Sequence, residues 1–204
     1  MQKFIRNSII GLLALFTTLQ PVAANAFFTP LAFSIIPPVQ FPPSDFSITG
    51  ARFNLLYGKH RDVYGLDIGA LGNVTDQTFV GLGVAGVANV TRGTTHAIGL
   101  QAAGITNVNT NKTRVYGVQL AGLVNMNTAE SMVAGIQVSA LANIAEFTDI
   151  YGAQIGLYNR AKDVYGFQIG LVNVATNLHG VQIGLANINQ KGLISVSPFL
   201  NIGF

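Results

Sequence analysis

The sequence of 204 residues contains no cysteine and no tryptophan, and it carries little charge. Without cysteine the chain can form neither disulfides nor thiolate metal sites, and its N-terminus cannot carry a lipid on a cysteine. Charged residues make up 9% of the chain, compared with about 25% in a typical soluble domain. Half of the residues are hydrophobic, a balance opposite to that of disordered chains.

The small excess of positive charge has little meaning for function. Lys and Arg number 11 and Asp and Glu number 8. Lys3 and Arg6 lie in an N-terminal leader, so the remaining chain has nine basic and eight acidic residues, a balance of +1. The basic isoelectric point therefore does not indicate a nucleic-acid partner.

Residues 1–26 have the pattern of a secretory signal peptide. Lys3 and Arg6 precede an apolar run at residues 9–19, and Ala24, Asn25 and Ala26 form an A-x-A cleavage pattern. We expect the cleaved chain to be exported through the inner membrane. No later segment approaches an 18-residue apolar helix, which leaves a closed β-barrel as the way to cross a membrane.

Residues 27–45 form a separate apolar segment that contains five of the seven prolines. Proline cannot donate a hydrogen bond to a β-ladder. We therefore expect this segment to be an extended N-terminal arm rather than a strand.

Residues 46–204 are dominated by a repeat of the form G-x-Q-φ, followed by small and apolar residues and then Asn. Side chains alternate with period two within each unit: Phe167 and Ile169 oppose Gly166, Gln168 and Gly170, which is the period of a β-strand. Successive leading glycines are 16, 18, 18, 18, 17, 14 and 14 residues apart, at Gly65, Gly81, Gly99, Gly117, Gly135, Gly152, Gly166 and Gly180. With one strand per unit and further strands at 46–57 and 193–204, the pattern predicts a small antiparallel transmembrane β-barrel of about ten strands.

A parallel β-solenoid is the alternative architecture. Stacked coils would align the repeat asparagines into a ladder, at Asn73, Asn89, Asn107, Asn125, Asn143, Asn159, Asn173 and Asn187. Two features favour the barrel. The unit shortens from 18 to 14 residues, and the outward face is aliphatic, whereas a soluble solenoid needs charge there.

The inward face of the predicted barrel is polar. A turn centred between Lys59 and His60 makes Arg52 and Asp67 cross-strand neighbours, and we expect them to form an ion pair in the lumen. Amides that can satisfy one another form a lumen belt beside this pair, made of Gln101, Gln119, Gln137, Gln154, Gln168 and Gln182.

Nothing in the sequence indicates catalysis. His60, His96 and His179 lie in or near different turns without a cluster of acidic partners, so metal binding and triad chemistry are not expected. We predict a protein that is not an enzyme and has no cofactor and no metal.

The C-terminus ends in alternating hydrophobic residues, Leu200, Ile202 and Phe204. This pattern resembles the terminal-strand signal of outer-membrane barrels, which implies the barrel assembly machinery as a partner. Four parts of the sequence carry a family resemblance: the segments at 52–58 and 63–69, the repeats at 152–187 and this C-terminus. In these parts the chain resembles the bacterial surface-repeat outer-membrane proteins and a porin-like, lipid-trapping superfamily of predatory bacteria. The resemblance covers about residues 50–204 and implies small barrels that assemble into a ring enclosing membrane lipid.

The outward face suggests how such a protein associates. Small residues that allow close packing between subunits are Gly72, Gly86, Ala88, Ala102, Gly104, Gly122 and Ala140. A lipid-facing set consists of Tyr165, Phe167, Ile169, Leu171, Val181, Ile183 and Leu185. We expect a homo-oligomeric outer-membrane protein that organises or traps membrane lipid. The alternatives are a narrow porin and a secreted surface β-solenoid adhesin.

Overall fold

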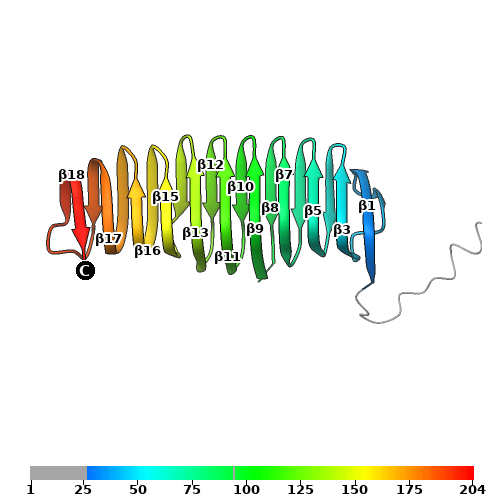
Figure 1. The fold of residues 1–204 in the computed structure, drawn as a ribbon, viewed down its shortest axis with the longest axis horizontal. Coiled ribbons are helices and arrows are strands. Elements are labelled where there is room, and N and C mark those ends of the chain that lie inside the picture. Colours follow the sequence, from blue (N-terminus) through cyan, green and yellow to red (C-terminus); the bar gives the residue numbers. More distant parts are fainter. Residues whose placement is uncertain (1–26, 94) are drawn as a thin grey trace, which may run out of the picture.

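The computed structural model describes residues 27–93 and 95–204, and it shows a parallel β-solenoid of about nine turns (Figure 1). The coils stack side by side along one axis, with β1 (Phe28–Ile36) at one end and β18 (Val196–Gly203) at the other. The predicted antiparallel barrel is therefore wrong, and so is the porin-like channel that depends on it. The predicted signal peptide at 1–26 lies outside the described residues. Among the described residues, no helix has the length and apolar character needed to span a membrane.

Each coil consists of a long strand, a two-residue turn, a short strand and a connection to the next coil. The long strands are β3 (Ser47–Asn54), β5 (Asp62–Gly69), β7 (Phe79–Ala85), β9 (Thr95–Ala103), β11 (Thr113–Ala121), β13 (Ser131–Ser139) and β15 (Thr148–Ile155). The short strands are β4 (Tyr57–His60), β6 (Gly72–Thr75), β8 (Ala88–Thr91), β10 (Thr106–Asn109), β12 (Val124–Asn127) and β14 (Ala142–Ala145). In the last coils, β16 (Tyr158–Ile169) and β17 (Val172–Asn189) join a short strand directly to the next long strand.

Equivalent residues of neighbouring coils lie directly beside each other. Gly117 pairs with Gly135 and Gln119 with Gln137, both in parallel register. A column of buried apolar side chains lies beside these polar residues, and it runs through Val63, Phe79, Ala97, Val115, Val133, Ile150, Val164 and Leu178. In the later coils Ala145, Ala161 and Ala175 join it from the side of the short strands. The core is therefore narrow and repeats once in every coil.

The shortening of the repeat, which favoured a barrel at the sequence level, is accommodated mainly in one connection. From Gly117 to Asn125 the chain advances eight residues, and from Asn125 to Gly135 it advances ten. The corresponding steps after Gly166 are seven and seven. Three of the four lost residues thus come from the segment that holds the connection between coils, while the stacked strands keep their register.

A column of glycines is required where the long strands approach each other. Gly117 has a φ of 136°, in the region that side chains with a Cβ rarely adopt. A Cβ at this position would lie 2.1 Å from the carbonyl oxygen of Gly99 in the preceding coil. The leading glycine of the repeat is therefore set by backbone stacking, and the same conformation recurs from Gly65 to Gly180.

Both ends of the solenoid are closed by strands that carry proline. The segment expected to be an extended arm rather than a strand contains two strands, β1 and β2 (Val39–Phe41). They pair with each other, and β1 also pairs with β3. At the other end β18 pairs antiparallel with β17 and contains Pro198. Proline is tolerated on edge strands because the missing N–H faces away from the sheet, which explains how Pro30 can lie within β1.

Replacing the glycine of one central coil tests this stacking. We expect Gly117→Ala to lower the free energy of unfolding by more than about 2 kcal/mol, because backbone strain of about 1–3 kcal/mol adds to a clash with the Gly99 carbonyl. Gly72→Ala is the matched control, since its nearest new contact lies 3.3 Å away and alanine stands at the equivalent position 88. Urea unfolding followed by circular dichroism measures both. Equal stability of the two variants would contradict the glycine column.

Candidate functional site

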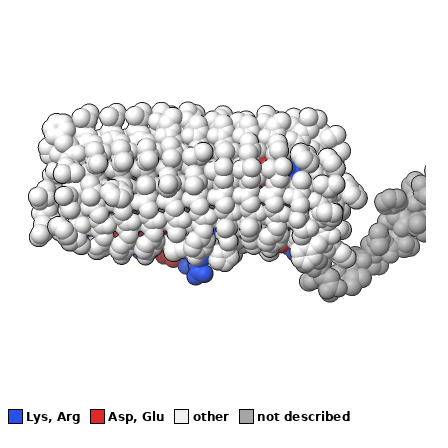
Figure 2. Space-filling model, viewed as in Figure 1, with Lys and Arg blue, Asp and Glu red and all other residues white. Residues whose placement is uncertain are grey.

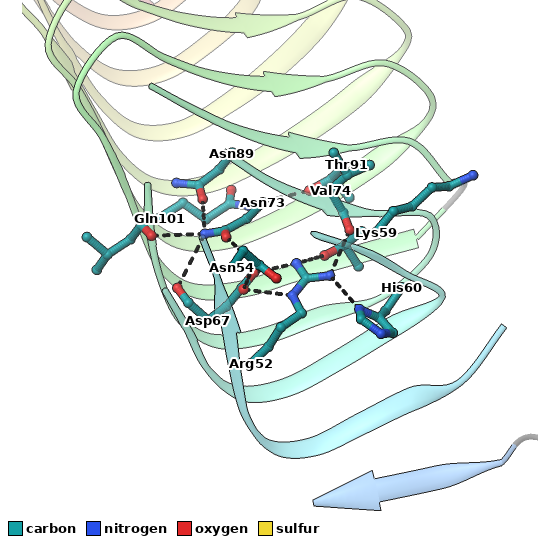
Figure 3. Close-up of polar contacts among 12 residues, drawn as sticks. Arg52, Asn54, Lys59, His60, Asp67, Asn73, Val74, Asn89, Thr91 and Gln101 are labelled. Carbon is teal, nitrogen blue, oxygen red and sulfur yellow. Dashed lines mark hydrogen bonds and ion pairs between the residues drawn. The ribbon is translucent and has the colours of Figure 1, made fainter. Parts of the chain in front are cut away.

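A buried ionic network lies at the N-terminal end of the interior (Figure 3). Arg52 donates from Nε to Asp67 Oδ1 at 2.7 Å and from Nη2 to Asp67 Oδ2 at 2.6 Å. Its Nη1 donates to the Val74 carbonyl at 2.9 Å, and both ionic side chains are excluded from solvent. The two residues are neighbours because β3 and β5 run parallel in adjacent coils, not because an antiparallel turn joins them.

His60 completes this network and connects it to the N-terminal segment. Its Nδ1 lies 3.3 Å from Arg52 Nη1, and its Nε2 lies 3.1 Å from the Pro42 carbonyl oxygen. A neutral ring with the proton on Nε2 accepts from the arginine and donates to the carbonyl. Burial, together with the Arg52 charge, lowers the pKa of His60 from 6.5 to about 4, so the ring is neutral at physiological pH.

The repeat amides form two continuous ladders inside the solenoid. Each asparagine, such as Asn125, donates from Nδ2 to the Oδ1 of the next coil's asparagine at 2.9 Å and also to a carbonyl of that coil. Each glutamine of the predicted belt donates in the opposite direction, as Gln137 does to Gln119 at 2.8 Å. These side chains are buried and mutually bonded from Gln101 to Gln182, which makes them structural rather than available to a ligand.

The two-residue turns form an edge of exposed aliphatic side chains, called here the aliphatic edge. One residue from each turn is between 37 and 62% exposed, and these residues are Leu56, Leu71, Val87, Ile105, Leu123, Leu141, Leu157, Leu171 and Leu185. The backbone of this edge is hydrogen-bonded from coil to coil, since the N–H groups of Leu123 and Val124 both donate to the Ile105 carbonyl. The edge therefore offers apolar side chains without unpaired backbone at these positions.

The outer faces of both strand sets are also largely apolar. On the long strands, Leu82, Leu120, Ile136 and Ile155 are among the exposed side chains. On the short strands, the outward side chains are mostly Gly, Ala and Val. The polar exceptions are Tyr57, Thr106 and Tyr158 next to the aliphatic edge, and the charged exceptions are Lys59 and Arg160 toward the opposite edge. An apolar surface of this extent marks an interaction surface on ordinary soluble proteins.

Charged side chains collect on the opposite edge, where the short strands connect to the next coil. Figure 2 shows Lys, Arg, Asp and Glu gathered mainly along one long edge, with most of the visible face free of charge. The described part of this charged edge holds six ion pairs: Lys59 with Asp76, Arg61 with Asp62, Lys112 with Glu130, Arg160 with Glu146, and Lys162 with both Asp149 and Asp163. Such exposed pairs contribute about 0–1 kcal/mol each, so the edge serves solvation more than stability.

Most of the small residues predicted to pack between subunits lie where the coils of the same chain approach each other. A Cβ on Gly86, Gly104 or Gly122 would lie 1.9–2.1 Å from a carbonyl oxygen of the preceding turn. Ala102 and Ala140 line a shallow hollow of about 470 Å³ near the same turns. Gly72 and Ala88 lie on the outer face of the short strands.

The other predicted surface residues are on the outside. Tyr165, Phe167, Ile169, Leu171, Ile183 and Leu185 are exposed and Val181 is half-buried. Leu200, Ile202 and Phe204 are exposed on or beside β18, and their recognition by an assembly machinery stays a prediction. A hollow of about 830 Å³ opens at the N-terminal end of the same outer surface, between Phe33, Ile35, Phe41, Phe53 and Ile68.

The described residues contain no group of three or more His, Asp or Glu side chains arranged to hold a metal ion. His60 is buried in the ionic network, whereas His96 and His179 are exposed beside Tyr116 and Tyr165. The three histidines are thus in different surroundings.

No protein-family model matches the chain, and neither a curated protein nor a solved structure shows significant similarity to it. The surface of the molecule is therefore the basis for a functional assignment.

Most of the aliphatic edge escaped the sequence analysis, which named only Leu171 and Leu185 from it. A signal for the whole set was present, because an aliphatic residue stands two positions before every repeat asparagine from Asn73 to Asn187. It was overlooked because each unit was interpreted as one strand and one turn, whereas each coil contains two strands and two turns.

The buried ion pair can be tested by removing one or both charges. We expect Asp67→Asn to cost roughly 3–5 kcal/mol, since Arg52 would remain buried without its counter-charge. The double variant Arg52→Met with Asp67→Leu should cost less than this single change. Denaturant unfolding of the variants provides the comparison. A double variant that is no more stable than the worse single variant would show that the pair is not coupled.

The lowered pKa of His60 predicts a specific pH dependence. Between about pH 6.5 and 4 the unfolded chain binds a proton that the folded chain does not, so stability falls as the pH decreases through this window. The shift corresponds to about 3 kcal/mol. We expect the wild type to lose this much more stability than His60→Gln between pH 7 and pH 4. Parallel pH profiles for the two proteins would contradict the assignment.

Proposed function

We propose that this protein is a non-enzymatic, exported β-solenoid that associates with membrane lipid through its apolar outer surface. The observation that carries the proposal is the separation of polarity around the coil. The aliphatic edge is apolar and both outer faces are largely apolar, while the exposed charged side chains gather at the opposite edge and at the strand ends next to it.

Hydrogen bonding favours lipid as the partner of this surface. A segment in contact with hydrocarbon must have its backbone polar groups satisfied internally. Each central strand forms backbone hydrogen bonds with the equivalent strands of the coils on either side, as β11 does with β9 and β13. The turns of the aliphatic edge are also hydrogen-bonded from coil to coil. The buried amide ladders likewise keep the polar side chains away from the outer surface.

The predicted signal peptide supports export through the inner membrane, and the outer membrane is the proposed location of the lipid contact. The solenoid has no closed channel in this proposal and needs no catalytic residue. Association between copies through the same apolar surface is the competing outcome, because two such surfaces would also exclude water from each other.

Vesicle flotation tests the proposal. We expect the wild type to float with phospholipid vesicles and Leu123→Glu/Leu141→Glu to remain largely in the aqueous fraction, because two charges would then lie on the aliphatic edge. Gln77→Glu/Gln190→Glu adds the same charge on exposed side chains away from this edge and is the matched control. All three proteins should have the same circular dichroism spectrum, since the substituted side chains are exposed.

The contrary results are equally clear. Wild-type protein that stays in the aqueous fraction with every vesicle composition would refute lipid association. Equal flotation of the two double variants would show that the aliphatic edge is not the contact surface. Sedimentation of vesicle-free wild type as a discrete oligomer, with no binding to lipid, would assign the apolar surface to self-association.

A further inference from the structure

The polarity of the long-strand face changes in order from the charged edge to the aliphatic edge. The outward row nearest the charged edge is polar or charged in most coils and includes His96, Arg114 and Asp149. The parallel register aligns Tyr64, Tyr116, Tyr151 and Tyr165 in the next outward row, which also holds Val80, Ile98, Ala134 and His179. The next rows are mostly aliphatic, as in Val118 and Leu120. Tyrosine is enriched where a membrane meets water, because its ring is apolar and its hydroxyl is polar.

The width of the apolar zone matches one leaflet of a bilayer. From Tyr116 to the end of β11 the strand advances five residues, about 17 Å at roughly 3.3 Å per residue. On the other face, β12 advances three residues from Val124 to Asn127, about 10 Å by the same rise. The hydrocarbon of one leaflet is about 15 Å deep, half of the roughly 30 Å of a bilayer.

The charged edge has free cations that complement lipid headgroups. Among the described residues, no ion pair involves Arg92 or Arg114, whereas Lys112 and Lys162 are paired with acidic residues. Both arginines are exposed, and Arg114 lies at the start of β11, two residues from Tyr116. Guanidinium groups bind phosphate through two parallel hydrogen bonds, so these side chains suit a phosphate-bearing surface.

Resting on the proposed lipid association, we propose that the solenoid inserts edge-on into one leaflet of a phospholipid membrane. The aliphatic edge points toward the bilayer centre, and both outer faces contact acyl chains. The tyrosine row lies at the interface, and Arg92 and Arg114 contact lipid phosphate groups. This orientation differs from one in which the solenoid lies flat on a single face.

The absence of tryptophan makes the orientation measurable. Single-tryptophan variants place a probe at the aliphatic edge (Leu141→Trp), on the long-strand face (Leu120→Trp), on the short-strand face (Met126→Trp) and at the charged edge (Thr128→Trp). The vesicles contain phosphatidylcholine and phosphatidylglycerol with bromine either near the headgroup or near the chain end. Bromine quenches tryptophan fluorescence at short range and so reports the depth of each probe.

Edge-on insertion predicts a pattern that no flat orientation gives. Bromine near the chain end should quench the probe at 141 most strongly, the probes at 120 and 126 should both be quenched, and the probe at 128 should not be. Vesicle binding with quenching at 120 but not at 126 would overturn the orientation and leave lipid association intact. A vesicle-free blue shift at 141 in an oligomeric protein would assign the edge to a second copy. Absence of vesicle binding would instead refute the proposed function itself.

The headgroup contact has its own test. A cationic side chain near an anionic surface contributes about 1 kcal/mol, so removing each arginine charge should weaken binding roughly fivefold. We expect Arg92→Gln/Arg114→Gln to bind phosphatidylglycerol vesicles roughly 25-fold more weakly than wild type. Arg92→Lys/Arg114→Lys should fall between the two, because lysine keeps the charge but cannot form two parallel hydrogen bonds to one phosphate. An unchanged affinity of the glutamine variant would overturn the assignment of these arginines.

Discussion

The whole architecture depends on hydrogen bonds between identical amide side chains in adjacent coils. An asparagine such as Asn125 accepts from the coil before it and donates both to the next asparagine and to a main-chain carbonyl. A buried polar group is costly when it is unpaired and favourable in a satisfied network. The ladder therefore requires every coil to present its amide at the same height, which fixes the parallel register of all strands that flank it.

The two ladders have opposite polarity along the solenoid axis. Asparagine amides donate toward the C-terminal end, as Asn107 does to Asn125, whereas glutamine amides donate toward the N-terminal end, as Gln119 does to Gln101. Their dipoles oppose each other, so the interior does not accumulate a large axial dipole. Near the N-terminal end the glutamine column gives way to Gly83, where the Phe79 ring occupies the adjacent space, and then to Asp67 and Arg52.

Sequence reasoning reached the repeat, the strand period and the inward set, but not the direction of strand pairing. The motif around Gln168 is nearly symmetric, with glycines on both sides, so the alternation of inward and outward residues is the same for parallel and antiparallel neighbours. The pairing of Arg52 with Asp67 illustrates this ambiguity, because a hairpin and a solenoid both place them together. The direction is determined instead by one-per-coil stacking of asparagines, which an antiparallel arrangement would not repeat at every strand.

The change in repeat length favoured a barrel over a solenoid at the sequence level, although a solenoid accommodates it. Stacking constrains the strands and the aliphatic edge, where the N–H groups of each turn donate to carbonyls of the preceding coil. The connection on the charged edge is under weaker constraint, and it can lose residues until β16 and β17 run without interruption. Coil length is therefore a poor criterion against a solenoid when the variation lies in one connection.

The same ladders also explain how a solenoid can have an aliphatic exterior, which was the second argument against this fold. A chain of low charge must place its polar groups somewhere, and here the interior takes them as paired amides. The outer rows then need not supply hydrogen-bonding side chains, and the backbone beneath them is already paired between coils. A single edge interacts with water through charged side chains, which are gathered there. A molecule built in this way is amphipathic across its width rather than between its core and its surface. An interface between water and hydrocarbon is the environment in which both of its edges are solvated favourably.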